Sequence, residues 1–425
     1  MVVKLEPLSI YDDFFKPKQS DEKTVDWGKF NLFETSVIKN SYSVQADFSV
    51  NATDKNWKNT AKKILIFSLK IIIFPWGIYK LTKYFFQRIV MMNIYPLQSK
   101  IVKKIYDLTD EKIDELRQTE SQKLVDKGFV VRHVFLEKNH VRYSGLLIGH
   151  KDTIQNGNWV LQATGNMEPI EFSFPSFAEA YRRVQFNVLL VNGPGAVRSE
   201  GVASNYTLGE AQEVGISFLE NSINAKKIIL AGRSLGGAAI SEAIMQHDFK
   251  PNIEYMVIRQ MTFDSVSNIA SKIFKQSFSK KIRRFIKQII RWTDCEIDSV
   301  QASIKVANLN IREIIVQATN KDIRPHETPK KEDFKSDGVI DAHASLAYRL
   351  IKYDITANKA FICLKDEEHN SNNPVTAPFP EIVNILEFKE SLVLTKNIFR
   401  SHANSCFEYF LRIGRIINRN LGILS

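Results

Sequence analysis

Cysteine is scarce in this chain of 425 residues, which contains only three. Cys295, Cys363 and Cys406 are far apart in the sequence and follow no metal-ligand spacing. A disulfide framework requires a high density of cysteines in a short chain, and a zinc site requires closely spaced ligands. The sequence therefore predicts neither feature, and it favours a reducing compartment.

A secretory signal and a long hydrophobic run are also missing. The N-terminus lacks the basic start and the unbroken apolar core of a secretory signal, so export by that route is not expected. The apolar run from Ile64 to Tyr79 is interrupted by Lys70 and contains Pro75 and Gly77. A membrane-spanning helix needs about 20 consecutive apolar residues, so this run is short for a span.

Acidic residues are outnumbered by basic ones, 47 to 58, which gives a formal net charge of +11. Such an excess favours anionic partners, either nucleic acid or a membrane leaflet. Residues 61–92 and 275–292 combine basic, aromatic and aliphatic side chains, and we expect both to contact an anionic membrane surface. The alternatives are a helix packed on the next domain and a solvated basic face. No nucleic-acid partner is expected, because no recognisable nucleic-acid-binding fold accompanies the charge.

The hydrophobic pattern divides the chain in two. Residues 1–127 are predicted to form an N-terminal extension that includes the apolar and basic segment 61–92. From residue 128 two alternating strands are followed by buried strands and amphipathic helices in turn. This alternation predicts a doubly wound, mostly parallel α/β sheet in residues 128–425, with active groups at the carboxyl ends of its strands. Residues 265–307 are predicted to form a helical lid inserted into that domain.

The most informative motif is Gly-Arg-Ser-Leu-Gly at residues 232–236. It follows a short aliphatic run, residues 228–231, and precedes small, helix-compatible residues. This is the G-x-S-x-G nucleophile elbow, in which glycines allow a turn sharp enough to expose the serine hydroxyl. The pattern predicts a strand, a turn and a helix, with the Ser234 Oγ at the carboxyl end of the strand.

A serine hydroxyl needs an imidazole to accept its proton and an acid to orient that imidazole. His369 follows the last predicted strand, residues 359–364, and is the preferred base. Asp322 follows the preceding predicted strand, and it is preferred over Asp337 as the acid because it lies closer to its strand. The remaining candidates are Asp264 for the acid, and His343 and His326 for the base.

Two backbone N–H groups are candidates for an oxyanion hole. One belongs to Leu235, the residue after the predicted nucleophile. The other belongs to Asn166, in the loop that follows the predicted strand NWVLQA. Both would bind the negative charge that develops on a carbonyl oxygen under attack.

Together these motifs resemble the α/β-hydrolase fold family of serine hydrolases, over about residues 128–369. The resemblance rests on the elbow GRSLGG, the loop ATGN where many members carry His-Gly-Asn, the strand and loop FNVLLVNGPGAVRSEG, the strand VQATNKD, and His369. It implies acyl transfer through a Ser-His-Asp triad, with no metal or organic cofactor. The loop that carries the acid departs from the tight G-x-x-D-x-x-V-P of many relatives.

The expected substrate is a lipid or acyl ester, or a thioester, at a membrane surface. A soluble peptidase or amidase on the same fold and a non-catalytic membrane-binding module are the alternatives. The basic, membrane-touching build is similar to that of effector hydrolases which intracellular bacteria deliver into host cells. That narrower resemblance implies a cytoplasmic or peripheral membrane location, or secretion into a host cell by a non-classical system.

Overall fold

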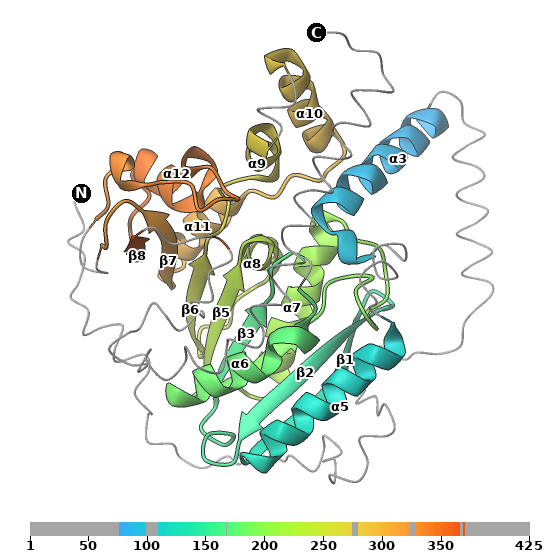
Figure 1. The fold of residues 1–425 in the computed structure, drawn as a ribbon, viewed down its shortest axis with the longest axis vertical. Coiled ribbons are helices and arrows are strands. Elements are labelled where there is room, and N and C mark those ends of the chain that lie inside the picture. The colour runs from blue at the N-terminus through green and yellow to red at the C-terminus, as the bar shows by residue number, and fades with distance from the viewer. Residues whose placement is uncertain are drawn as a thin grey trace.

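Eight strands form one sheet in the computed structural model, which describes residues 76–98, 109–166, 168–273, 279–323, 328–365 and 369 (Figure 1). The strands are β1 (Phe129–Lys138), β2 (Val141–His150), β3 (Asn158–Ala163), β4 (Asn187–Val191), β5 (Lys227–Arg233), β6 (Glu254–Gln260), β7 (Arg312–Thr319) and β8 (Lys359–Lys365). Their order across the sheet is β1-β2-β4-β3-β5-β6-β7-β8, and β2 alone runs against its neighbours. This is the α/β-hydrolase fold, which confirms the predicted fold class.

Helices cover the sheet, as the central strands require. The helices are α3 (Trp76–Ile94), α5 (Asp110–Asp126), α6 (Ile170–Arg183), α7 (Asn205–Asn221), α8 (Leu235–Gln246), α9 (Val266–Ile273), α10 (Lys280–Trp292), α11 (Ser299–Asn308) and α12 (Leu346–Lys352). Short 3-10 turns are η3 (Pro96–Gln98), η4 (Lys331–Asp333) and η5 (Ala342–Ala344). The residues of β3 and β4 are all buried, because parallel strands are covered on both faces.

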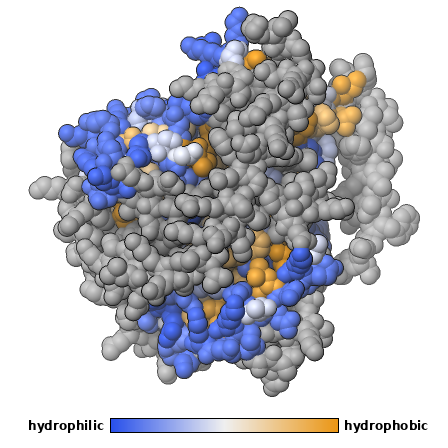
Figure 2. Space-filling view, in the orientation of Figure 1, coloured by the Kyte–Doolittle hydropathy of each residue, from blue (hydrophilic) through white to orange (hydrophobic). Residues whose placement is uncertain are grey.

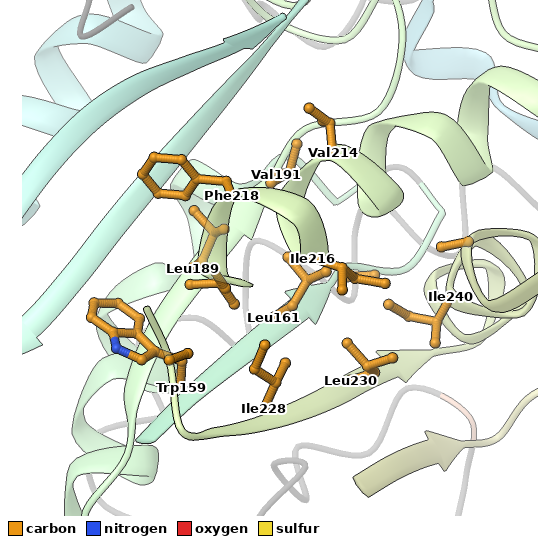
Figure 3. Close-up of a cluster of buried hydrophobic side chains, with 14 of the residues drawn as sticks. Trp159, Leu161, Leu189, Val191, Val214, Ile216, Phe218, Ile228, Leu230 and Ile240 are labelled. Atoms are coloured by element: carbon orange, nitrogen blue, oxygen red, sulfur yellow. The ribbon is translucent and has the colours of Figure 1, made fainter. Parts of the chain in front are cut away.

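Two apolar cores lie on opposite faces of the sheet. In one core, side chains of β3, β4 and β5 pack against α7, α8 and α11, and Figure 3 shows members of this core on the strands, such as Leu161 and Leu230, and on the helices, such as Phe218. In the other, alternate residues of the same strands, such as Val160 and Ile229, pack against α6 and the end of α5. The alternation follows from the two-residue period of a strand.

The region before residue 128 contributes to this fold. α5 packs against β1 and α6, and Leu124 near its end belongs to one of the two cores. The segment 61–92 is described only from residue 76, where α3 begins. Among the described residues, none of the helices combines the length and the apolar composition needed to cross a bilayer.

The predicted lid segment, residues 265–307, contains three helices with different surroundings. α11 packs on α8 and β7, with Ala302 and Val306 in the core, so it is the crossover helix that returns the chain to the sheet. α9 and α10 pack against each other, and α10 also contacts α3. A cap made of α3, α9 and α10 therefore lies beside the sheet; we call it the cap below.

Candidate active site

Ser234 occupies the turn between β5 and α8, as the motif predicts. Its backbone has φ of 53° and ψ of −120°, and its N–H donates to the Gln260 carbonyl at 2.9 Å. Close packing of the backbone requires glycine at positions 232 and 236. A Cβ on Gly232 would lie 2.6 Å from the backbone of Gly236, and a Cβ on Gly236 would collide with the carbonyl of Ala163.

His369 lies against this serine. Its Nε2 is 2.9 Å from the Ser234 Oγ, although the two residues are 135 positions apart in the chain. The imidazole is buried, with only 6% of the residue exposed. The other ring nitrogen, Nδ1, is 2.8 Å from Oδ2 of Asp337. An ionised carboxylate only accepts hydrogen bonds, so Nδ1 carries the proton and Nε2 is left to accept from the serine.

Asp337 is held in place by its own turn. Its Oδ1 accepts the N–H groups of Val339 and Ile340 at 3.0 and 2.7 Å, which leaves Oδ2 for the imidazole. Its carbonyl accepts the N–H of His369 at 2.6 Å. Asp337 and His369 are thus joined through both backbone and side chain, and the carboxylate is fully buried.

The preference for Asp322 as the acid is corrected by this geometry. The Asp322 carboxylate accepts the N–H of Lys365, at 2.8 Å, and so caps the end of β8 instead of orienting the histidine. Beyond it the chain runs back along the end of β7, where Asn320 N–H donates to the Asp333 carbonyl and Lys335 N–H to the Ala318 carbonyl. This return of the chain brings Asp337 to His369, although Asp322 is closer to β7 in the sequence.

The other candidates have different partners. The Asp264 carboxylate accepts from Arg349 Nε at 2.6 Å and from Asn268 at 2.7 Å. Burial raises the pKa of Asp264 to about 6, even though Arg349 and Asn268 favour its ionised form. His343 is exposed, with its ring against Tyr348. His326 lies outside the described residues.

The loop that carries Asn166 lies against the elbow. An ideal Cβ on Gly165 would be 3.8 Å from the Arg233 carbonyl, which shows how closely the two turns approach. Asn166 itself is exposed. Leu235 is the first residue of α8, and a helix gives its first N–H groups no internal partner. Its N–H and the helix dipole both favour negative charge beside Ser234.

Two positioning residues were not found by sequence reasoning. Glu168 holds the Asn166 loop, because its carboxylate accepts the Gly165 N–H at 3.2 Å and its carbonyl accepts the Thr164 hydroxyl at 2.7 Å. Arg233, inside the elbow motif, donates a side-chain hydrogen bond to the His369 carbonyl. The position of Arg233 next to Ser234, inside the G-x-S-x-G motif, was a signal that could have identified it. Glu168 had no signal beyond its place in the loop.

Several solved structures are similar to this chain. An esterase from Pyrococcus furiosus has 11% identity and a TM-score of 0.38, with coverage of 69% of this chain and 92% of that one. An alpha-beta hydrolase from Vibrio vulnificus has 15% identity and a TM-score of 0.46, with coverage of 68% of this chain and 94% of that one. Carboxyl esterase 2 from the mycorrhizal fungus Tuber melanosporum has 13% identity and a TM-score of 0.40, with coverage of 62% of this chain and 88% of that one. No curated protein matches the chain.

A protein-family model also matches the sequence. The match covers residues 58–378, which is more than half of the 425 residues and includes the whole sheet, Ser234, Asp337 and His369. That model is described as Chlamydia CHLPS protein (DUF818), and the chain belongs to this family.

Proposed function

We propose that the protein is a serine hydrolase that cleaves an ester or thioester through an acyl-enzyme intermediate. One observation carries the proposal: an uninterrupted hydrogen-bond chain runs from Ser234 Oγ through both nitrogens of His369 to the buried Asp337 carboxylate, with distances of 2.9 and 2.8 Å. Such a chain has the connectivity that activates a serine for nucleophilic attack.

In the first half of the reaction, His369 Nε2 accepts the Ser234 proton while Oγ bonds to the carbonyl carbon of the substrate. The Asp337 carboxylate stabilises the imidazolium that forms, and the N–H groups of Leu235 and Asn166 bind the oxyanion. The tetrahedral intermediate then breaks its bond to the leaving alcohol or thiol, which takes the proton from Nε2. The product is an acyl ester of Ser234.

In the second half, His369 Nε2 accepts a proton from water, whose oxygen attacks the acyl carbon. Collapse of this intermediate breaks the bond to Ser234 Oγ, and the proton returns from Nε2 to the serine. A carboxylic acid leaves, and the enzyme regains its starting protonation state. No group beyond these side chains and water is needed to balance the atoms.

The surroundings of Ser234 support an acyl or lipid substrate. Leu235, Ala238 and Ala239 at the start of α8 belong to an apolar cluster with Met91 of α3 and Ile290 of α10. We expect the acyl chain of the substrate to bind beside this cluster, because binding gains free energy from apolar surface removed from water.

Labelling with a fluorophosphonate probe tests the proposal directly. The wild-type chain and a Ser222→Ala control are expected to label, whereas Ser234→Ala and His369→Ala are not. Turnover of p-nitrophenyl esters of increasing chain length should fall at least about 10⁴-fold in Ser234→Ala. Labelling that persists in Ser234→Ala would refute the assignment of the nucleophile. Hydrolysis of the matching anilides but not the esters would favour a peptidase or amidase.

A further inference from the structure

α3 presents an apolar stripe to solvent. Ile78, Leu81, Phe85 and Ile89 are each at least 42% exposed, and their spacing of three and four residues puts them on one side of the helix. The opposite side holds Met91, which is fully buried against the body of the protein. Packing on the domain therefore accounts for only one face of α3.

α10 has the same division with a different outer face. Ile290 and Ile286 pack inward, while Phe285 is 61% exposed and lies among the exposed Lys281 and Arg284. The helix carries six basic residues, and α3 carries three. Neither of these two helix sequences contains an acidic residue.

The two helices, about 200 residues apart in the chain, meet. Trp292 at the end of α10 donates its indole N–H to the Tyr79 hydroxyl at 3.1 Å, and its ring also packs on Phe86. Lys83 pairs with Asp294 at 2.6 Å. Figure 1 shows α3 and α10 projecting on the same side of the molecule, and Figure 2 shows exposed hydrophobic residues where α3 lies.

We infer that the outer faces of α3 and α10 form one docking surface for an anionic phospholipid bilayer. Soluble monomers rarely leave a contiguous apolar stripe in water, so such a stripe marks a surface that is covered in use. The exposed Lys281 and Arg284 complement the anionic headgroups of phosphatidylserine-type lipids, whereas Phe85, Phe285 and the exposed Tyr84 suit the boundary between headgroups and acyl chains.

The surface would lie on the membrane rather than cross it. α3 has 19 residues and includes Lys80, Lys83 and Arg88, which keeps it too polar for a span. Its inner face stays packed beside Leu235, so docking would hold the candidate active site close to the bilayer. The inference goes beyond the proposed function and does not depend on it, because docking requires no turnover.

Vesicle flotation of the full chain tests the surface, with vesicles of phosphatidylcholine alone and of phosphatidylcholine mixed with phosphatidylserine. We expect flotation only with the anionic vesicles, and weaker flotation at high salt. Replacing Lys281 and Arg284 by Glu should lower the affinity by roughly tenfold or more. The matched control replaces two exposed lysines outside the cap, Lys151 just after β2 and Lys226 just before β5, by Glu; it changes the net charge equally and should retain binding.

A second pair of variants tests the apolar stripe. Ile78→Ser, Leu81→Ser and Phe85→Ser together should abolish flotation, whereas Met245→Ser, Leu309→Ser and Tyr353→Ser, equally exposed elsewhere, should not. Equal loss in target and control variants, or equal binding to neutral vesicles, would overturn the inference. So would a dimer in size-exclusion chromatography that the stripe variant alone dissociates, because the stripe would then bind a second copy. Variants that no longer float should still be labelled by the fluorophosphonate probe. Loss of membrane binding is then distinguished from loss of the proposed catalytic function.

Discussion

Ser234 shows how a residue's chemistry depends on the packing around its backbone. A non-glycine residue with φ of 53° and ψ of −120° is strained, at a cost on the order of 1–3 kcal/mol. The conformation persists because the N–H of Ser234 donates to the Gln260 carbonyl. In addition, the backbone at Gly232 and Gly236 is packed so closely against neighbouring backbone that the turn has no room to relax. The strain keeps the hydroxyl pointing out of the sheet, within reach of His369.

The choice between the two acids is testable at single residues. Asp337→Asn should lower kcat by about 10⁴-fold, because an amide that donates to Nδ1 would favour the tautomer in which Nε2 carries the proton. Asp322→Asn should change kcat by no more than a few-fold, since this side chain only caps β8. Steady-state ester hydrolysis and the rate of fluorophosphonate labelling measure both. If Asp322→Asn proved the more damaging variant, the acid would have to be reassigned.

His247 is a buried imidazole far from this chemistry, and it predicts a pH dependence of stability. Its Nδ1 lies 3.1 Å from Glu213 and its Nε2 2.8 Å from Glu220. Burial alone would lower the pKa of His247, but the hydrogen bonds to the two carboxylates outweigh burial and raise it above 6.5. The charged histidine therefore stabilises the fold fully below about pH 6.5, and this contribution is lost as the pH rises through the folded-state pKa.

Urea unfolding of the wild type and of His247→Gln measures this contribution. The difference in unfolding free energy should be largest at about pH 5.5 and should shrink at about pH 8.5 and above. The neutral amide is close in size and still forms hydrogen bonds, so the comparison isolates the charge. A difference that did not vary with pH would mean that His247 acts only through packing.

At the level of elements, local pattern was enough to predict the strands and the elbow helix. The aliphatic run at residues 228–231 and the glycines around Ser234 specify β5, its turn and α8 within a few residues of one another. The alternation of helices and strands after residue 128 also predicts a mostly parallel sheet, but it does not give the strand order, in which β4 lies between β2 and β3. The predicted features depend on near neighbours in the sequence, which is why the sequence alone predicts them.

The loop after β7 shows what local pattern misses. Its path depends on contacts between residues at its two ends, where Thr319 bridges Phe334, and on β8, where Ile323 bridges Cys363. Neither contact has a signature in the residues of the loop, so sequence proximity favoured Asp322. The same limit applies to residues 265–307, because only packing on α8 and β7 distinguishes α11 from the cap helices.

At the scale of the whole molecule, three distant segments form one cluster beside Ser234. The N-terminal region supplies Met91 and Leu97. Helix α8 supplies Leu235 and Ala238, and α10 supplies Ile290. The central sheet has two cores of its own, so the cap is an addition to a fold that is already complete. We therefore expect the cap to open locally at a lower free energy than the sheet.

Met91 provides the test of this separation, because its side chain is fully buried where α3 packs on the rest of the domain. Met91→Ala should remove roughly 2–5 kcal/mol of packing from α3. Hydrogen exchange in α3 and α10 should then accelerate strongly while β3, β5 and β6 keep their protection. Ile89→Ala, two residues away but 42% exposed, is the matched control and should change little. Equal acceleration in the sheet would show that the cap and the sheet unfold as one unit. Acceleration confined to the cap would show that the cap opens separately, and such opening would alter the surroundings of Ser234, because its neighbour Leu235 packs in the same cluster.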